Sequence, residues 1–71
     1  MGSRREEELA TFEGVEVEYE SDKALLCIIP GHEDKIWIPK SQLREGNELK
    51  EKGDKGELVV TEWLATQKNL L

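Results

Sequence analysis

The side chains able to do chemistry in this 71-residue chain are few and poorly spaced for catalysis. The single histidine, His32, stands beside Glu33 and Asp34, and three adjacent residues rarely converge on one metal ion. Ser41 has no histidine that the spacing would place beside it as a base. Carboxylates on an exposed strand repel one another rather than divide into an acid and a base. We therefore expect a protein that is not an enzyme and has no metal and no cofactor.

One group of residues suited to binding is acidic. Glu16, Glu18 and Glu20 alternate with apolar residues, so a strand would project them from one face at intervals of about 6.6 Å. Such a line could imitate a phosphate backbone and bind a basic protein. The alternative is a solvated face that prevents edge-to-edge pairing of strands. The candidate protein-binding residues are Glu16, Glu18, Glu20, Asp22, Glu33 and Asp34.

A second group combines an aromatic side chain with basic ones. Trp37 lies opposite the face that Ile36 and Ile38 share, and an exposed Trp near Lys and Arg can stack on single-stranded nucleic acid. The candidate nucleic-acid-binding residues are Lys35, Trp37, Lys40 and Arg44. The favoured alternative buries Trp37 under a C-terminal helix against Trp63, because two tryptophans add much apolar area to a small core.

The charge is acidic and unevenly distributed. The formal net charge is −6, and residues 1–34 hold ten acidic and three basic side chains, whereas residues 35–71 hold six and seven. This balance disfavours non-specific binding to nucleic acid and favours a larger basic protein as partner. The lone cysteine, Cys27, lies in an apolar run and is predicted to be a buried thiol in a reducing compartment. The apolar run over 24–29 is too short to span a membrane, so we expect a cytoplasmic protein. Either a monomer or a homodimer is compatible with the sequence.

The elements that would position these residues are mainly strands. Apolar and acidic residues alternate over 15–20, which is the period of a strand with one buried and one exposed face. A bulge at Glu13 and Gly14 would return Phe12 to the buried face. The residues expected on that face are Phe12, Val15, Val17 and Tyr19.

A hairpin and a helical turn are predicted next. Residues 23–29 are apolar on both faces, which indicates the most buried strand, and 35–38 form the returning strand. Pro39 ends that strand, because it cannot donate to a sheet ladder. One helical turn over 41–43 would then bring Leu43 back to the core.

The last third of the chain reads as a connection, a strand and a helix. The polar residues 44–55 predict a mobile loop or a frayed short helix over 48–52. A strand follows over 57–60, and Thr61 is a suitable N-cap for a closing helix over 62–69.

Together these elements predict a mainly β (β-rich α+β) fold. Hairpin-joined strands with a helical turn before the last strand indicate a small open barrel, SH3-like or OB-like. The alternative is a curled four-stranded antiparallel sheet covered by the C-terminal helix. The domain would span 11–71, after a charged tail or short helix over 1–10 in which Ser3 and Glu6 match a capping box.

Two segments together resemble a group of small proteins from bacteriophages and other mobile elements. They are residues 36–43 (IWIPKSQL) and residues 53–65 (GDKGELVVTEWLA), and the resemblance covers 23–71. It implies a genomic setting and no mechanism. The expected function is a small acidic binding module that docks on a larger basic protein, such as one that handles nucleic acid or serves in defence. The alternative is a module that binds single-stranded nucleic acid.

Overall fold

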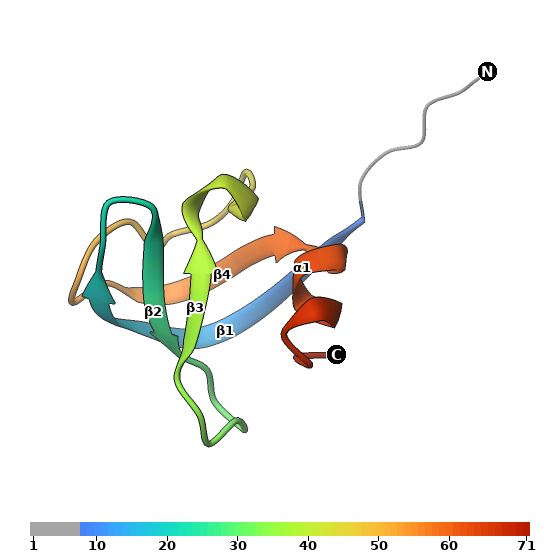
Figure 1. The fold of residues 1–71 in the computed structure, drawn as a ribbon, viewed down its shortest axis with the longest axis horizontal. Helices are drawn as coiled ribbons and strands as arrows, with labels where there is room; N and C mark the ends of the chain where they lie inside the picture. The colour runs from blue at the N-terminus through green and yellow to red at the C-terminus, as the bar shows by residue number, and fades with distance from the viewer. Residues whose placement is uncertain (1–7) are drawn as a thin grey trace.

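The first strand, β1 (Leu9–Glu20), is long enough to pair with two different neighbours. Its N-terminal half pairs antiparallel with β4 (Lys55–Thr61), and its C-terminal half pairs with β2 (Ala24–Ile28). β3 (Ile36–Pro39) pairs with the other edge of β2, which gives one antiparallel sheet in the order β3-β2-β1-β4. The structure is a computed structural model that describes residues 8–71 (Figure 1).

Two short helical elements complete the fold. The 3-10 turn η1 (Lys40–Gln42) follows β3, and the helix α1 (Glu62–Gln67) follows β4. The sheet curls into an open half-barrel, and α1 packs beside β4 and β1 at one end of it (Figure 1). The predicted fold class is confirmed: a mainly β curled sheet with a helical turn after the third strand and a C-terminal helix.

A bulge lets β1 change neighbours along its length. The register with β4 shifts between Phe12 and Val15, where Gly14 adopts a φ of 72° that glycine tolerates best. Ala10 and Val15 are buried and Phe12 packs against the core, so the bulge predicted at this point is confirmed. β1 begins at Leu9, which places the start of the domain two residues before the predicted boundary at 11.

A second bulge, which the alternation did not predict, lies farther along β1. The register with β2 shifts between Val17, which pairs with Cys27, and Tyr19, which pairs with Leu26. Glu18 is therefore an additional residue, and it turns every later side chain of β1 to the opposite face. Tyr19 is 53% exposed, so the prediction that it lies in the core is wrong.

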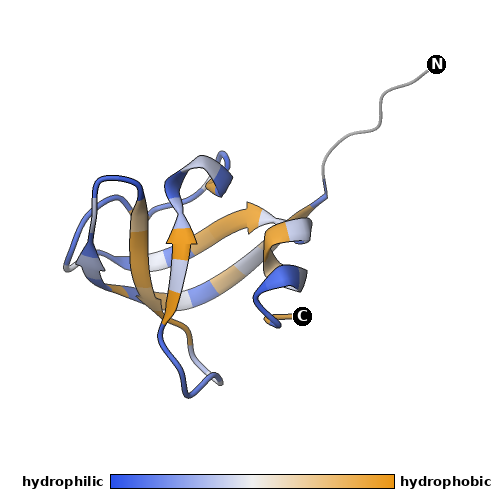
Figure 2. Cartoon of the chain, in the orientation of Figure 1, coloured by the Kyte–Doolittle hydropathy of each residue, from blue (hydrophilic) through white to orange (hydrophobic). Residues whose placement is uncertain are grey.

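The core lies inside the curl of the sheet. Figure 2 shows β2 and the C-terminal half of β4 as predominantly hydrophobic. The largest fully buried side chains are Leu25, Ile29, Ile38, Leu49, Leu58, Val15, Val17, Val60 and Cys27. Cys27 is a buried free thiol, as predicted, and burial raises the pKa of this thiol to about 11.

The connection between η1 and β4 is ordered against the sheet. The backbone N–H of Arg44 donates to the carbonyl of Val59 at 2.9 Å, and that of Glu48 donates to the carbonyl of Glu57 at 2.9 Å. Leu49 is fully buried in the core. No helix forms between η1 and β4, so the segment is a loop, and the alternative prediction of a frayed helix over 48–52 is wrong. One leucine in a polar run is enough to hold the segment because the open edge of β4 supplies backbone partners.

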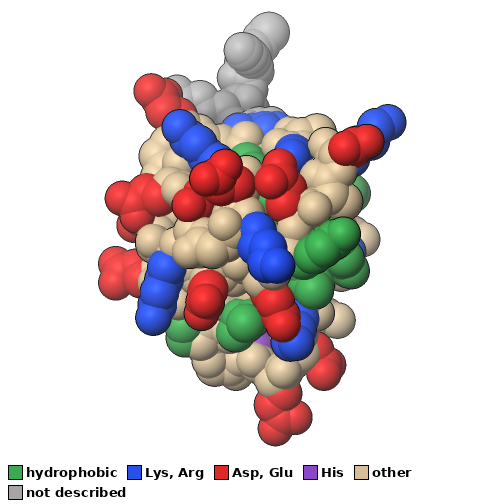
Figure 3. Space-filling model, turned by 90° about the vertical axis from the view of Figure 1, so that its left-hand side faces the viewer, with side chains coloured by type: hydrophobic (Ala, Val, Ile, Leu, Met, Phe, Trp, Pro, Cys, Tyr) green, Lys and Arg blue, Asp and Glu red, His purple; other side chains and the backbone are tan. Residues whose placement is uncertain are grey.

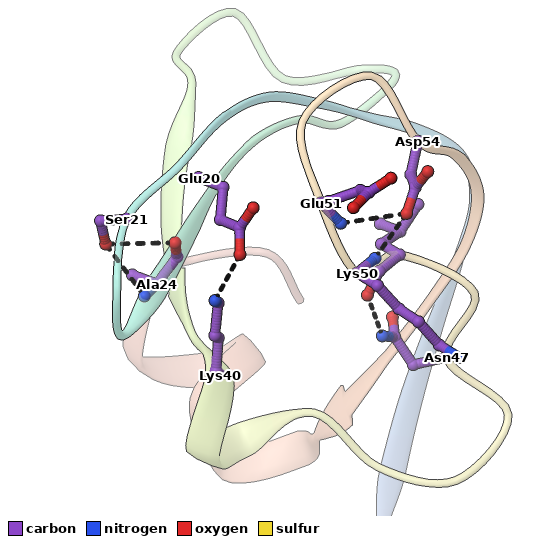
Figure 4. A network of polar contacts seen from close by, with 9 residues as sticks. Glu20, Ser21, Ala24, Lys40, Asn47, Lys50, Glu51 and Asp54 are labelled. Carbon is purple, nitrogen blue, oxygen red and sulfur yellow. Dashed lines mark hydrogen bonds and ion pairs between the residues drawn. The ribbon is translucent and has the colours of Figure 1, made fainter.

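The end of this connection is held by Asp54. Its Oδ2 accepts the backbone N–H groups of Lys50 and Glu51 at 2.8 Å and 3.0 Å, and Figure 4 shows the three residues gathered there. The backbone carbonyl of Asp54 accepts the N–H of Val17 at 2.8 Å, and the N–H of Gly53 donates to the carbonyl of Val17 at 2.9 Å. The end of the connection is therefore hydrogen-bonded to the backbone of Val17, the residue of β1 that precedes the second bulge.

Thr61 begins α1, as predicted. Its side-chain Oγ1 accepts the N–H of Leu64 at 3.2 Å, which satisfies one of the helix's free donors. The helix ends at Gln67, two residues before the predicted end, because Asn69 adopts a φ of 60° and breaks the helical path. Leu70 then returns to the core.

Two further expectations concern the ends and the membrane. The capping box predicted at Ser3 and Glu6 lies outside the described residues. Among residues 8–71, no helix is long and apolar enough to cross a membrane.

Candidate protein-binding surface

The outer face of β1, β2 and β3 carries a cross-strand row of apolar side chains. Tyr19 is paired with Leu26, and Leu26 is paired with Trp37, so the three lie side by side across the strands. Ile28 follows Leu26 on the same face of β2, because side chains two residues apart point the same way. We call Tyr19, Leu26, Ile28 and Trp37 the aromatic face. Its exposed fractions are 53% for Tyr19, 43% for Trp37 and 37% for Ile28.

The two rings of the aromatic face touch each other above Leu26. The ring centroids of Tyr19 and Trp37 are 6.2 Å apart, and the ring planes stand at 88°. This edge-to-face arrangement is a preferred one for aromatic pairs, because the positive edge of one ring meets the negative face of the other. The contact holds both rings in place outside the core. A partner would therefore meet a large apolar surface that is already ordered.

The prediction that Trp37 is buried under the C-terminal helix is wrong. Ile38 is fully buried, and alternation along β3 then requires Trp37 to point outward. The helix α1 packs against β4 and β1 rather than over β3. Trp63 is also exposed, by 63%, so the expected packing of the two tryptophans does not form. The core is filled mainly by aliphatic side chains instead, with Cys27 among them and Phe12 packed against it.

The acidic line predicted on β1 is broken by the second bulge. Glu16 is paired with the exposed Ile28, which places it on the outer face. Glu20 is paired with the buried Leu25 and so lies on the opposite side, where its Oε2 binds Lys40 Nζ at 2.6 Å (Figure 4). The three glutamates therefore do not share one face, because the extra residue shifts the alternation by one.

The remaining acidic candidates lie at opposite ends of the hairpin. Asp22 is exposed in the turn between β1 and β2, whereas Glu33 and Asp34 are exposed in the loop between β2 and β3 (Figure 1). Together with Glu16 they place negative charge at both ends of the aromatic face. Figure 3 shows the largest group of hydrophobic side chains on the visible face at its right-hand edge, while acidic and basic side chains are scattered over the rest.

The basic candidates are not gathered around Trp37. Lys35 lies on the same side as Trp37, but its Nζ is 2.7 Å from Glu18 Oε1. Lys40 is paired with Glu20, on the other side of β1. The guanidinium of Arg44 donates through Nη1 to the carbonyls of Ser41 and Leu43 at 2.8 Å and 3.1 Å. Of the nucleic-acid-binding set, only Lys35 and Trp37 are thus brought together.

The residues considered above for catalysis or metal binding lie in separate elements: His32 in the loop between β2 and β3, and Ser41 in η1. Within residues 8–71, no cluster of three or more His, Cys, Asp or Glu side chains could hold a metal ion. His32 is half-buried in the hairpin loop, where its backbone N–H donates to the carbonyl of Ile29 at 3.0 Å. Ser41 is exposed in η1.

Comparison with protein-family models, with curated proteins and with solved structures found no match for this chain. Three members of the aromatic face, Tyr19, Leu26 and Ile28, were missed by reasoning from the sequence. Leu26 and Ile28 could have been found, because β2 is apolar on both faces and a half-barrel of this size covers only one of them. Tyr19 could not, because the alternation of its neighbours continues through the bulge without interruption.

Proposed function

We propose that this protein is a non-enzymatic protein-binding module that docks on a basic protein through the aromatic face. The observation that carries the proposal is the exposed ring pair: Trp37 and Tyr19 touch each other, and both remain about half exposed. Trp and Tyr dominate the energetic centres of protein interfaces, because they bury a large area at a small entropic cost.

The charge around the aromatic face supports a basic partner. The centre of the surface contains apolar side chains and the ion pair between Lys35 and Glu18, which is neutral overall. Asp22 lies at one end, and Glu33 and Asp34 lie at the other. An apolar centre with a charged rim is the usual anatomy of a binding patch, and the rim charges steer the encounter.

The resemblance of residues 36–43 and 53–65 to phage and mobile-element proteins adds a setting to this proposal. In that setting the partner would be a protein that handles nucleic acid or serves in defence, since such proteins carry basic surfaces. The module would act in the cytoplasm, as a monomer or a homodimer, by covering or adapting that surface.

Affinity capture with matched variants tests the proposal. The tagged protein is incubated with host lysate at low and high salt, the bound protein is identified, and its dissociation constant is measured by titration. We expect a basic partner whose binding weakens about 30-fold or more in Trp37→Ala, the cost of about 2 kcal/mol typical of a hot spot. Leu71→Ala, which removes a side chain that is 68% exposed and outside the aromatic face, is the control.

Two results would count against the proposal. Binding that Trp37→Ala and Tyr19→Ala leave unchanged would show that the aromatic face is not the interface. If the captured partner has no basic surface and its binding does not weaken at high salt, the acidic residues at the ends of the aromatic face (Asp22, Glu33 and Asp34) have no role in binding.

Single-stranded nucleic acid is the second candidate ligand, and the exposure of Trp37 is the observation that favours it. The pairing of Lys35 and Lys40 with carboxylates opposes it, because phosphate binding depends on cations that can release counterions. Titration of the Trp63→Phe variant with single-stranded oligonucleotides at low salt isolates the fluorescence of Trp37. Absence of quenching removes this candidate.

A further inference from the structure

A groove of about 440 Å³ lies between η1 and α1, beyond the end of β3. Its lining residues are Pro39, Ser41, Gln42, Trp63, Leu64, Gln67 and Lys68. Trp63 is 63% exposed, which makes it the most exposed aromatic side chain of residues 8–71. The volume falls within the range of about 300–1,000 Å³ that is usual for ligand pockets.

The apolar wall of the groove is held in place by the core. Trp63 is followed by Leu64 and Ala65, which are both buried and fix the orientation of α1. Pro39, whose ring is rigid, stands on the η1 side. Because the buried Leu64 and Ala65 fix the rotation of α1 about its axis, the indole of Trp63 stays on the exposed side of the helix.

The polar part of the groove is rich in hydrogen-bond donors. Gln42 Oε1 accepts the hydroxyl of Thr61 at 2.7 Å, and the same hydroxyl oxygen accepts the N–H of Leu64. Because its oxygen is engaged in this way, the amide of Gln42 is oriented and its two N–H donors point away from Thr61. The amide of Gln67 and the ammonium group of Lys68 add further donors along α1.

The charge of the groove is opposite to that of the rest of the molecule. Residues 8–71 contain fourteen acidic and eight basic side chains, yet the lining contains no carboxylate and one cation, Lys68. Glu62, which precedes Trp63, lies at the other end of α1 beside Glu8. An anionic ligand in this groove would therefore meet one cation and no carboxylate among the lining side chains.

From this charge complementarity we propose that the groove binds an extended, acidic peptide segment of a partner protein. An apolar side chain of the segment packs on Trp63, its backbone carbonyls accept from Gln42 and Gln67, and one of its carboxylates pairs with Lys68. This site is separate from the aromatic face and does not depend on the function proposed for it.

Peptide titrations followed by NMR test the inference. The ¹⁵N-labelled protein is titrated with an acetylated hexapeptide of alternating Glu and Leu, and with a matched peptide in which Lys replaces Glu. We expect the Glu peptide to shift the indole N–H of Trp63 and the side-chain amide of Gln42, and to leave the indole N–H of Trp37 unmoved. Trp63→Ala should weaken binding at least tenfold.

Charge reversal separates the groove from the overall charge of the protein. Lys68→Glu should weaken binding of the Glu peptide at least fivefold, whereas Lys52→Glu, an exposed position in the connection before β4, should change it less than twofold. Equal or tighter binding of the Lys peptide would overturn the inference, as would equal effects of the two charge reversals. Shifts confined to Trp37 would also overturn it while leaving the proposed function intact.

Discussion

Replacing Leu49 by alanine tests whether the connection between η1 and β4 belongs to the core. Leu49 is fully buried and packs in the main hydrophobic cluster, although it lies in a segment without regular structure. Truncation of a buried leucine costs about 2–5 kcal/mol, because the transfer energy is lost and a cavity remains. A domain of this length has a free energy of unfolding of roughly 4–10 kcal/mol, so the loss is a large fraction of the total.

Urea unfolding followed by tryptophan fluorescence measures this loss. A destabilisation of 1 kcal/mol lowers the Tm of so small a domain by about 4–8 °C, so in a thermal melt the variant should unfold about 8 °C or more below the parent. Lys52→Ala, in the same connection but exposed, is the control and should stay within about 0.5 kcal/mol of the parent. If Leu49→Ala is no more destabilising than the control, the connection does not contribute to the core and the reasoning fails.

Three further predictions concern single contacts. Thr61→Ala should lower the free energy of unfolding by about 1–2 kcal/mol in chemical denaturation, because the cap of α1 is lost, and Thr61→Ser should restore most of it. Cys27, whose pKa is raised to about 11 by burial, should react with a thiol reagent at pH 8 only as fast as the protein unfolds. A hydrogen bond with the Glu8 side chain, and the charge of Glu8, raise the pKa of Glu62, so Glu8→Gln should lower this pKa toward its ordinary value in an NMR titration.

Replacing Glu8 should also change the stability of the protein in a way that depends on pH. A carboxyl group with a raised pKa binds its proton more tightly in the folded state, so its contribution to stability is lost as the pH rises through that pKa. Glu8→Gln should therefore raise the Tm at pH 7, with a gain that disappears as the pH falls below the pKa of Glu62. A gain that persists at low pH would assign the effect to another cause. Rapid labelling of Cys27 under native conditions would likewise contradict its burial.

Local sequence signals predicted the order and type of the elements well. Gly14 marked a bulge, Pro39 marked the end of an edge strand, and Thr61 marked a helix cap, because each of these residues acts on its own backbone or its immediate neighbours. The alternation of Ile36 and Ile38 correctly gave the face of β3 that is buried.

The candidate site was predicted only in part, because its composition depends on distant segments. Trp37 was recognised as a residue that could be exposed, but its exposure depends on where α1 packs. The face of Tyr19 depends on the bulge at Glu18, beside which the backbone of Val17 is bound by residues 53–54. No pattern within β1 contains that information.

By itself, the sequence determined that four strands, a helical turn and a helix would follow one another, since these elements arise from residues close together in the chain. Only the tertiary structure determined which apolar residues remain at the surface. The two-residue period of a strand tells which side chains share a face. It does not tell whether other segments of the chain will pack over that face and bury it. In this half-barrel the core closes without either tryptophan, and both indoles are left exposed at the surface.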